Sequence, residues 1–494
     1  MDRLEELARS LLRQRYLILA SNRGPVEHHY IEGEIRITRG SGGVVTALGS
    51  LGRVVPFTWV ASALGEADRQ AAQMARGSYI SIPLDNVSFR YVVSPSRMYH
   101  KYYNVFSNPF LWFLHHSLWD LTYTPEIDRS IYDAWDKGYV PVNRAFASVI
   151  LEETLAREGS PVIMLHDYHL YLTGNMLRRA LPEALILHFN HIPWPPSEYL
   201  TLVPKRIRSA ILEGLCSCDI VGFQTGWDVR KFLLSCQDHL QGAEVDFSTS
   251  IVSFQGRNVQ VRQYPVSIDV HELWDLAESS TVRKHEINLR RLTKGKTIVR
   301  VDRMDPSKNI LRGFRAYELL LRRHPELLGK VNYLAFLVPS RTDIREYQIY
   351  TDQVLDLIQR VNATFKQRGW IPIHLFHQEN YEQALAGMRL YDVLLVNPII
   401  DGMNLVAKEG PIVNTKNGVV VLSERAGAYE QLGSAVIPVS PADVEETSVA
   451  LYEALTMDEV KRVQMNKLLR EMITKEDLTH WLYRQMEDLR LLVQ

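Results

Sequence analysis

A loop of mixed chemistry follows an apolar run of the chain. The run YDVLLVNPII leads into DGMNLVAKEG, residues 401–410, in which Asp401 comes first and Glu409 near the end. The apolar run is typical of a buried parallel strand. Open α/β folds bind their ligands at the carboxyl ends of such strands. The stretch is therefore either a simple strand-to-helix turn or a ligand site.

A second loop carries two cations. In VDRMDPSKNI, residues 301–310, Arg303 and Lys308 lie five residues apart around a proline turn. Taken alone, they are most simply two solvated cations on a surface loop. Fixed on one tight turn after a strand, they would instead suit a diphosphate, because arginine offers a planar fork and lysine a compact charge. Such groups could stabilise the charge that builds on a leaving group.

Two further strand ends carry polar side chains. In FNHIPWPPSEYL, residues 189–200, His191 follows a buried strand, and three prolines hold the next turn rigid. Asp167 stands at a strand end in LHDYHLYL, residues 165–172. A single histidine is more often structural than catalytic, but this rigid setting favours a group held in one orientation.

A glycine-rich stretch precedes a helical pattern near the N-terminus. GSGGVVTALGSL, residues 40–51, places three glycines where a phosphate could approach backbone N–H groups and the positive end of a helix dipole. This signal is weak alone, because glycine-rich turns are mostly structural. The dinucleotide fingerprint is absent, since the first predicted strand runs into SNRGP. A nicotinamide-dependent dehydrogenase is therefore disfavoured.

Apolar strands alternate with helical patterns along the whole chain. Leu311, Phe314, Tyr317 and Leu321, for example, share one face of a predicted helix. The alternation predicts an α/β protein with mainly parallel sheets. The predicted buried strands are 16–21, 161–166, 184–190, 219–224, 296–302, 331–338, 392–397 and 418–423.

The predicted strands fall into two groups that divide near residue 265. There, QVRQYPVSIDV contains a proline and leads into a charged helical stretch, so we expect one domain over 1–265 and a second over 266–494. The tail TKEDLTHWLYRQMEDLRLLVQ predicts one long helix, which Thr474 could cap, with Asp477 three residues on. Two α/β domains that meet at a cleft are a preferred setting for ligands.

The bulk composition excludes several classes of protein. A chain of 494 residues exceeds one ordinary core, and its 46% hydrophobic and 23% charged residues are typical of a soluble protein. A net charge of −1 disfavours nucleic-acid or membrane-surface binding by bulk electrostatics. The N-terminus predicts an amphipathic helix with Leu4, Leu7 and Leu11 inside, rather than a signal peptide, and no segment approaches bilayer length. We therefore expect a cytoplasmic protein.

The cysteines favour neither disulfides nor zinc. Cys216, Cys218 and Cys236 are too few and odd in number for a disulfide framework. The C-S-C spacing lacks a second ligand pair, so a zinc site is disfavoured and buried thiols are expected.

In their order and spacing, ten short motifs closely resemble the trehalose-6-phosphate synthase family of retaining glycosyltransferases. The resemblance runs from about residue 16 to the C-terminal helix. DGMNLVAKE and HDYHL are specific signatures, whereas SNR or GG alone would mean little. The resemblance implies a GT-B fold, in which two Rossmann-like domains face each other across a cleft. The last helix, about residues 476–494, would cross back to the first domain. The motifs are SNR, GG, YYNVFSNPFLW, HDYHL, HIPWPPSE, GFQT, DRMDPSK, PSRTDIREY, DGMNLVAKE and VLSERAGA.

The resemblance also implies a transfer of glucose from a nucleotide sugar to a phosphorylated acceptor, with no cofactor and no metal. Arg303 and Lys308 would bind the donor diphosphate, together with backbone N–H groups at the start of the following helix. Glu409 would accept hydrogen bonds from the ribose, and Asp401 would hold hydroxyls of the glucose. The implied donor-binding residues are Gly42, Gly43, His191, Arg303, Lys308, Asp401, Gly402, Met403, Asn404, Leu405, Val406 and Glu409.

The acceptor would be held mainly by the N-terminal domain. Arg23, Tyr103 and Arg341 would clamp its phosphate, while His191 and Asp167 would contact the transferred glucose. The implied acceptor-binding residues are Arg23, Tyr103, Trp112, Asp167, Gln224 and Arg341. The implied catalytic residues are Asp167, His191, Arg303, Lys308 and Asp401. On this interpretation the loop 401–410 is a ligand site.

The sequence departs from the family pattern at several positions. The family usually has W-x-G-W-x-G where this chain reads TWVASALG, so that Trp59 matches the first tryptophan and Ser62 replaces the second. Ile400 stands where an arginine commonly precedes DGMN, and EGPIVN replaces the usual EYVA. These changes leave the donor residues intact and leave the acceptor open.

We therefore interpret the sequence as that of an enzyme that makes trehalose 6-phosphate from a nucleotide-activated glucose and glucose 6-phosphate. One alternative is a related synthase with another phosphorylated acceptor, such as glycerol 3-phosphate or a cyclitol phosphate, including pseudo-glycosyltransferase chemistry that makes a C–N bond. The other is an inactive regulatory protein, against which the intact Asp401, Glu409, Arg303 and Lys308 argue. The nucleotide (UDP, GDP or ADP) and the oligomeric state, including a homo-oligomer, stay open.

Overall fold

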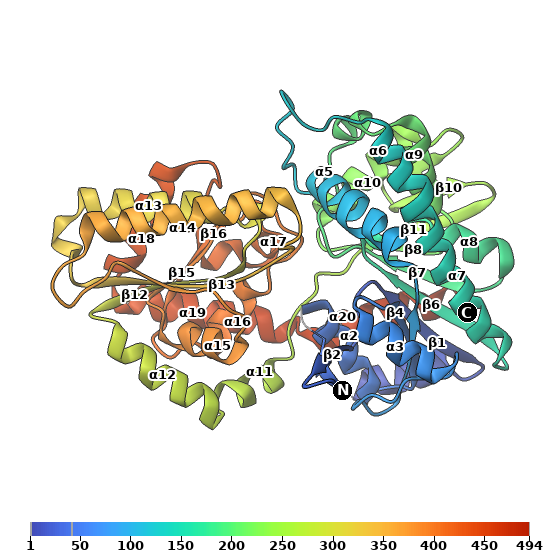
Figure 1. Cartoon of the computed structure of the whole chain (residues 1–494), viewed down its shortest axis with the longest axis horizontal. Helices are drawn as coiled ribbons and strands as arrows, with labels where there is room; N and C mark the ends of the chain where they lie inside the picture. The colour runs from blue at the N-terminus through green and yellow to red at the C-terminus, as the bar shows by residue number, and fades with distance from the viewer. Residues whose placement is uncertain (1, 41–42, 494) are drawn as a thin grey trace. The chain divides into compact units, whose positions relative to one another are not determined.

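The computed structural model describes residues 2–40 and 43–493, which form two compact α/β units (Figure 1). Unit 1 comprises Met1–Pro265 together with Thr479–Gln494, and unit 2 comprises Val266–Leu478. The chain therefore returns to unit 1 for its last helix, α20 (Leu478–Leu491). Within unit 1, the indole N–H of Trp481 in α20 donates to the carbonyl of Tyr264 at 3.1 Å.

Unit 1 is built on a sheet of nine strands in the order β5-β4-β1-β6-β7-β8-β11-β10-β9. The first seven strands in this order, from β5 to β11, pair in parallel with their neighbours. Strand β10 pairs antiparallel with both β11 and β9. The central strands are buried along most of their length, as expected for parallel strands covered on both faces. The strands are β1 (Arg15–Ser21), β4 (Phe57–Ser62), β5 (Val87–Val92), β6 (Ser160–His166), β7 (Leu185–Phe189), β8 (Ile220–Phe223), β9 (Glu244–Asp246), β10 (Ile251–Phe254) and β11 (Arg257–Gln263), and β2 (Val26–Ile31) and β3 (Glu34–Arg39) form a separate hairpin.

The helices of unit 1 include one irregular segment. A π-helical stretch over Lys101–Trp112 continues α4 and contains Pro109, and π-helical turns are frequent at functional sites. The α-helices are α1 (Asp2–Leu11), α2 (Gly43–Gly49), α3 (Glu66–Ala75), α4 (Ser96–His100), α5 (Phe113–His115), α6 (Arg129–Ala134), α7 (Val140–Leu155), α8 (Thr173–Ala180), α9 (Lys205–Leu215) and α10 (Gly226–His239).

Unit 2 contains a six-stranded, fully parallel sheet in the order β14-β13-β12-β15-β16-β17. Helices α13, α14 and α18 lie on one side of this sheet and α12, α15, α16 and α19 on the other (Figure 1). The strands are β12 (Lys296–Arg303), β13 (Val331–Val338), β14 (Ile373–Phe376), β15 (Val393–Val396), β16 (Val419–Ser423) and β17 (Ile437–Val439).

Several helices of unit 2 begin at a side-chain cap. The carboxylates of Asp269, Asp443 and Asp458 accept hydrogen bonds from backbone N–H groups in the first turns of α11, α18 and α19. The helices are α11 (Val270–Ala277), α12 (Ser280–Leu292), α13 (Ile310–Arg323), α14 (Arg345–Phe365), α15 (Tyr381–Leu390), α16 (Val406–Val413), α17 (Ala428–Leu432), α18 (Val444–Thr456) and α19 (Glu459–Lys475).

The predicted strands and the buried N-terminal helix are confirmed. For the C-terminal helix, the predicted N-terminal cap is wrong. Thr474 lies inside α19 and caps no helix, and the helical path stops at Glu476, whose backbone has φ −118° and ψ 60°. Helix α20 then begins at Leu478, directly after Asp477. The hairpin β2–β3 and strands β4, β5, β9, β10, β11, β14 and β17 were not predicted. Several of them, such as β9 and β14, are short and only partly buried, whereas β4 is buried throughout and was missed although its segment is mostly apolar.

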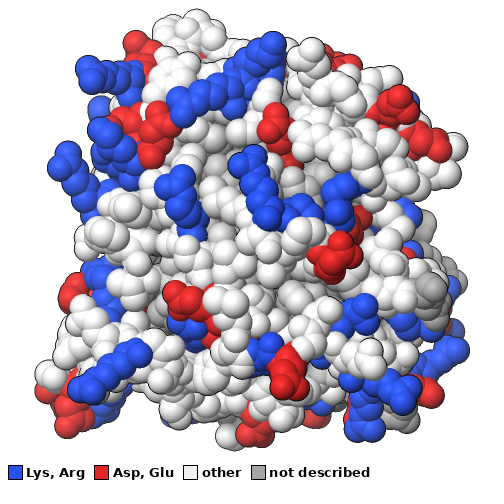
Figure 2. Space-filling view, turned by 90° about the vertical axis from the view of Figure 1, so that its right-hand side faces the viewer, with Lys and Arg blue, Asp and Glu red and all other residues white. Residues whose placement is uncertain are grey.

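The surface carries both signs of charge. On the face shown in Figure 2, lysine and arginine side chains are interspersed with aspartate and glutamate, in keeping with the net charge of −1. In the part of the chain that the structure describes, no helix combines the length and the apolar character needed to cross a membrane.

Candidate active site

The loop after β15 places Asp401 at the carboxyl end of the parallel sheet of unit 2. Its Oδ1 accepts the Gly402 backbone N–H at 3.0 Å, and its Oδ2 accepts the Asn404 side-chain amide at 3.0 Å. Asn404 has a left-handed backbone, with φ 71°, and turns the chain into α16 two residues later. Asparagine tolerates this conformation better than most residues. The loop therefore holds the Asp401 carboxylate in a fixed orientation.

A second loop supports the first by close backbone approach. The Asp401 N–H donates to the carbonyl of Arg425 at 3.1 Å, and the Ala428 N–H donates to the carbonyl of Met403 at 2.9 Å. A Cβ atom on Gly427 would lie 1.7 Å from the Gly402 carbonyl oxygen, so only glycine permits this contact. The motif SERAGA therefore has a structural role in shaping the DGMN loop.

The two cations of the second loop occupy different surroundings. Lys308 is only 12% exposed, and its ammonium forms an ion pair with Asp401 Oδ2. Arg303 is 44% exposed, with Nη2 3.8 Å from the buried carboxylate of Asp305. Because β12 and β15 are adjacent parallel strands, their loops meet at one edge of the sheet. The predicted donor groups Arg303, Lys308 and Asp401 therefore lie on neighbouring loops of unit 2.

Helix α16 begins at Val406, so the N–H groups of its first turn have no acceptor within the helix. Glu409 lies in that turn, partly buried, and burial raises its pKa to about 7, against the lowering effect of a hydrogen bond from Tyr381. Its neighbour Lys408 is fully buried, and its ammonium donates to the carbonyl of Val266 at 2.9 Å. The N–H groups of Lys408 and Glu409 donate to the carbonyl of Leu405, at 2.8 Å each. The Lys408 side chain is thus held in the interior, whereas the partly buried Glu409 lies at the start of the helix.

Asp167, in unit 1, has a strained backbone at the end of β6. Its φ of 75° and ψ of 169° lie in a region that is almost restricted to glycine. Its N–H donates to the Phe189 carbonyl at 2.8 Å, and its own carbonyl lies 3.2 Å from Nε2 of His188. Such strain persists where the surroundings enforce it, and it clusters at active sites.

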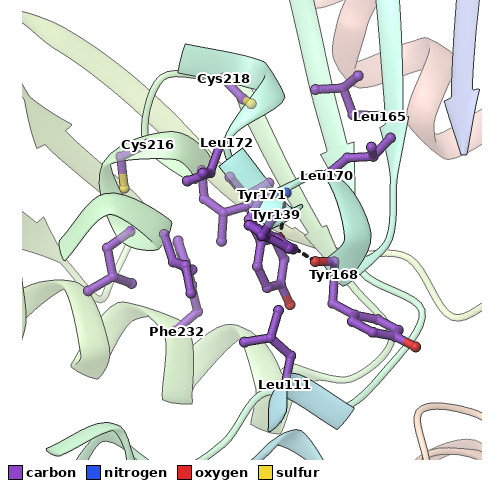
Figure 3. Packing of buried hydrophobic residues seen from close by; sticks show 14 of the residues in the cluster. Leu111, Tyr139, Leu165, Tyr168, Leu170, Tyr171, Leu172, Cys216, Cys218 and Phe232 are labelled. Carbon is purple, nitrogen blue, oxygen red and sulfur yellow. Dashed lines mark hydrogen bonds between the residues drawn. The ribbon is translucent and has the colours of Figure 1, made fainter. Parts of the chain in front are cut away.

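A group of tyrosines supports the segment that follows Asp167. The hydroxyl of Tyr139 donates to the carbonyl of Tyr168 at 2.5 Å and accepts the N–H of Tyr171 at 3.3 Å (Figure 3). All three tyrosines are buried. Satisfied polar contacts inside an apolar cluster are costly to break, so this network holds the HDYHL segment in place.

His191 lies beside two other buried histidines of unit 1. Its Nε2 is 3.1 Å from Nδ1 of His166, and its ring packs edge-on against Phe189. Burial lowers the pKa of His191 and of His188 to about 3, and it lowers the pKa of His166 well below the usual range. These imidazoles are therefore neutral near pH 7, and they serve as hydrogen-bonding groups rather than cations.

The predicted phosphate-binding residues of unit 1 lie next to a polar cluster around Asn22. The Asn22 side chain accepts from Ser62 at 3.0 Å and from Tyr102 at 3.2 Å, and it donates to the Tyr99 hydroxyl at 3.2 Å. Tyr99 in turn stacks on Tyr103, with ring centroids 5.6 Å apart. The serine that departs from the family pattern is therefore buried and bonded within an aromatic surround.

Arg23 and Tyr103 interact, and the phenol of Tyr103 is one of the groups that raise the pKa of Arg23, although burial itself lowers that pKa. Trp112 and Gln224 are buried elsewhere in unit 1, and Trp112 stacks on His116 with centroids 3.9 Å apart. Arg341 belongs to unit 2.

Arg341 is only 7% exposed, and its Nη1 donates to Asp305 and to the Tyr347 hydroxyl, both at 2.7 Å. Its guanidinium is therefore held next to the loop that carries Arg303. A phosphate would share this guanidinium with Asp305.

Several residues around these groups could not be recognised from the sequence. His166 and His188 lie within strands that read as apolar, and the signal that marks them is the recurrence of histidine in LHDYH and LHFNH. Of the predicted glycines, Gly43 is the first residue of α2, whereas Gly42 lies outside the described residues. Among residues 2–40 and 43–493, no group of three or more His, Cys, Asp or Glu side chains could hold a metal ion.

Taken together, unit 2 offers two cations, a helix N-terminus and two carboxylates, which suit the diphosphate, the ribose and the sugar hydroxyls of a nucleotide sugar. Unit 1 contains a strained aspartate, neutral histidines, an arginine and a tyrosine, which are groups that suit a sugar that carries a phosphate.

The chain is similar to known proteins over most of its length. The chain is 33% identical over 472 residues to "Alpha,alpha-trehalose-phosphate synthase [UDP-forming] A" of Dictyostelium discoideum, which covers 94% of this chain and 61% of that relative's length. "Trehalose-6-phosphate from E. coli bound with UDP-2-fluoro glucose" has a TM-score of 0.81 and 29% identity, over 96% of this chain and 99% of that one.

The structure of "an alpha,alpha-trehalose-phosphate synthase (UDP-forming) from Burkholderia xenovorans in complex with glucose-6-phosphate" has a TM-score of 0.81 and 29% identity, over 96% of this chain and 99% of that one. The fold is therefore that of a GT-B glycosyltransferase. The family model "Glycosyltransferase family 20" matches residues 15–491, and the chain belongs to that family.

Proposed function

We propose that this protein transfers glucose from UDP-glucose to glucose 6-phosphate and forms trehalose 6-phosphate with retention of configuration. The observation that carries the proposal is the ion pair of Lys308 and Asp401 at the ends of adjacent strands, in a member of family 20. UDP is chosen among the nucleotides because the similar synthases are described as UDP-forming.

Unit 2 would bind the donor. The guanidinium of Arg303 is exposed enough to reach a diphosphate, and Lys308 could bridge the diphosphate and Asp401. The first-turn N–H groups of Leu405 and Val406 would add to this positive field. Glu409, as a carboxylate, would accept hydrogen bonds from the ribose hydroxyls.

Unit 1 would bind the phosphorylated acceptor. Arg23 and Tyr103 would hold its phosphate, with Arg341 of unit 2 as a further predicted contact. The neutral imidazole of His191 and the carboxylate of Asp167 would hold hydroxyls of the glucose that is transferred. Trp112 and Gln224 are the remaining predicted acceptor residues.

In the proposed reaction, the bond between the glucose C1 and the diphosphate oxygen breaks, and the acceptor hydroxyl bonds to C1 from the same face. The acceptor proton passes to the departing phosphate oxygen. Arg303 and Lys308 stabilise the negative charge that develops there, which is how preorganised charges lower a barrier. Since these side chains supply the positive charge, we expect no requirement for a metal ion.

A different phosphorylated acceptor is the main alternative, because Ser62 and Ile400 differ from the family pattern. We favour glucose 6-phosphate because Ser62 is buried and shares its partner Asn22 with Tyr99 and Tyr102, so aromatic side chains already surround the position of the missing tryptophan. Tyr99 is partly exposed, and its ring is suited to the apolar face of a sugar.

The proposal is tested by incubating the purified protein with UDP-, GDP- and ADP-glucose and a panel of acceptors, with and without EDTA. Product masses and anomeric proton couplings would identify the disaccharide and its configuration. We expect an α,α-linked disaccharide phosphate from UDP-glucose and glucose 6-phosphate, at the same rate in EDTA. A loss of activity in EDTA that magnesium restores would contradict the metal-free transfer, and binding without turnover of any pair would favour a regulatory protein.

A further inference from the structure

Arg300 is a fully buried guanidinium in the middle of unit 2, with no role assigned above. It projects from β12, three residues before Arg303. Its Nε donates to Asp302 Oδ2 at 2.8 Å, and its Nη1 donates to Asn397 Oδ1 at 2.8 Å. Its Nη2 donates to the backbone carbonyl of Lys308.

The bonds to Asn397 and Lys308 join the two loops that carry the candidate donor groups, whereas the bond to Asp302 lies within β12. Asn397 follows β15 and leads into the loop of Asp401, while Lys308 ends the turn that follows β12. The same two segments are joined again by Asn309, whose side-chain amide donates to the Asn397 carbonyl at 2.9 Å. One planar guanidinium thus fixes the backbone of Lys308 relative to both strand ends.

The packing around Arg300 accommodates this arrangement. A Cβ atom on Gly313 of α13 would lie 2.4 Å from Nη1 of Arg300, so the helix must carry glycine where it passes over the guanidinium. Burial raises the pKa of Asp302, and the adjacent Arg300 charge opposes that rise. An apolar residue would fill the same space at a lower desolvation cost, but it would leave the Lys308 carbonyl without this donor.

We propose that Arg300 is a positioning residue for the glycosyl transfer: its fork holds the Lys308 backbone so that the ammonium stands beside Asp401 and meets the donor diphosphate. The inference rests on the proposed role of Lys308. A residue that positions a leaving-group cation acts mainly on turnover, because the stabilised charge develops in the transition state.

The Arg300→Lys variant keeps the charge and removes the three-way fork. It should lower kcat by tenfold or more and change the KM for UDP-glucose by less than threefold. The same substitution in a Lys308→Ala protein should lower kcat by less than twofold, because the group that Arg300 positions is already absent. Such non-additivity is the signature of two residues that act through one contact.

The matched control is Arg389→Lys. Arg389 is also a buried guanidinium of unit 2, bonded to Glu278 and Glu286 at 2.8 Å, on helices away from both loops. This variant should lower the melting temperature at least as much as Arg300→Lys does, while kcat changes by less than twofold. If Arg300→Lys prevents folding, Asn397→Ala, which removes a single partner of Arg300, should show the same dependence on Lys308.

The outcomes separate two failures. If Lys308→Ala leaves kcat unchanged, the proposed role of Lys308 is wrong, and the inference is overturned with it. If Lys308→Ala lowers kcat, but Arg300→Lys lowers it by the same factor with and without Lys308, Arg300 is a stability residue and only the inference is overturned.

Discussion

The two candidate half-sites differ in the kind of group that each presents. In unit 2, the central contact is an ion pair between Lys308 and Asp401, with the exposed guanidinium of Arg303 nearby. In unit 1, the groups around His191 are uncharged imidazoles that burial holds far below their usual pKa. Charge dominates one half-site, and neutral hydrogen bonding dominates the other.

The difference follows from what each half-site would have to recognise. A diphosphate that departs with growing negative charge is stabilised by fixed cations in a protected site. A glucose ring has no charge, so it is selected by hydroxyl contacts, and a nearby imidazolium would add nothing to its recognition. Unit 1 has two charged exceptions: the proposed carboxylate contact of Asp167 with the glucose, and Arg23, which with Tyr103 would bind the phosphate of the acceptor.

The largest expected effect is a loss of turnover when a cation of unit 2 is removed. Lys308→Ala should lower kcat about a hundredfold or more, as expected when one preorganised electrostatic group is lost. Steady-state kinetics with UDP-glucose and glucose 6-phosphate would measure it. The matched control is Lys416→Ala, which removes a lysine of unit 2 bonded to Asp392 at 2.9 Å, and which should change kcat by less than twofold. Similar losses in the two variants would remove the special role of Lys308.

The next effect concerns the ribose. Glu409→Ala should weaken UDP binding by about thirtyfold, because hydrogen bonds to a charged group contribute about 1.5–3 kcal/mol. Calorimetric titration with UDP and with a 2′,3′-dideoxy analogue would measure it. The analogue should bind the variant and the unchanged protein equally. A variant that loses affinity for both ligands to the same degree would place Glu409 away from the ribose.

A smaller effect should appear as a pH dependence of donor binding. Since burial raises the pKa of Glu409 to about 7, the free protein carries mostly the carboxylate at pH 8 and mostly the neutral acid at pH 6. Donor binding prefers the carboxylate, so affinity should fall as the pH drops, by about tenfold between pH 8 and pH 6. In Glu409→Gln this dependence should flatten. An affinity that rises on acidification would contradict the assignment.

The smallest effect is expected in unit 1. Because burial lowers the pKa of His191 to about 3, its ring should remain neutral from pH 8 down to pH 5. NMR spectra of ¹⁵N-labelled histidine would show no titration of this ring in that interval, and a His191→Gln protein would identify its signal. A midpoint between pH 6 and pH 7 would mean that the His191 ring of unit 1 also carries positive charge near neutral pH.

Much of this arrangement could be predicted from the sequence, and the reasons are local. The strand before Asp401, Val393–Val396, is apolar throughout, so its end at a ligand-binding edge followed from the rules for parallel sheets. The proline between Arg303 and Lys308 indicated that both residues belong to one turn.

Other features depend on contacts that no local pattern encodes. Lys408 is fully buried although it is a lysine beside Glu409 in the first turn of a helix, because its side chain donates a hydrogen bond to the carbonyl of Val266. Arg300 resembles an exposed strand residue until Gly313 and Asn397 are seen beside it. The helix break at Glu476 likewise follows from the path of the chain between α19 and α20 rather than from the helical pattern of its sequence.

The identity of the acceptor tests the proposed function most directly. The measurement is kcat/KM for glucose 6-phosphate against glycerol 3-phosphate, a cyclitol phosphate and unphosphorylated glucose, each with UDP-glucose as donor. We predict that glucose 6-phosphate exceeds each of the others by at least tenfold, because both the phosphate-binding residues and the aromatic surround of Ser62 favour it. A higher kcat/KM for glycerol 3-phosphate or the cyclitol phosphate would contradict the trehalose 6-phosphate assignment, and one for glucose would contradict the phosphate-binding role of Arg23 and Tyr103.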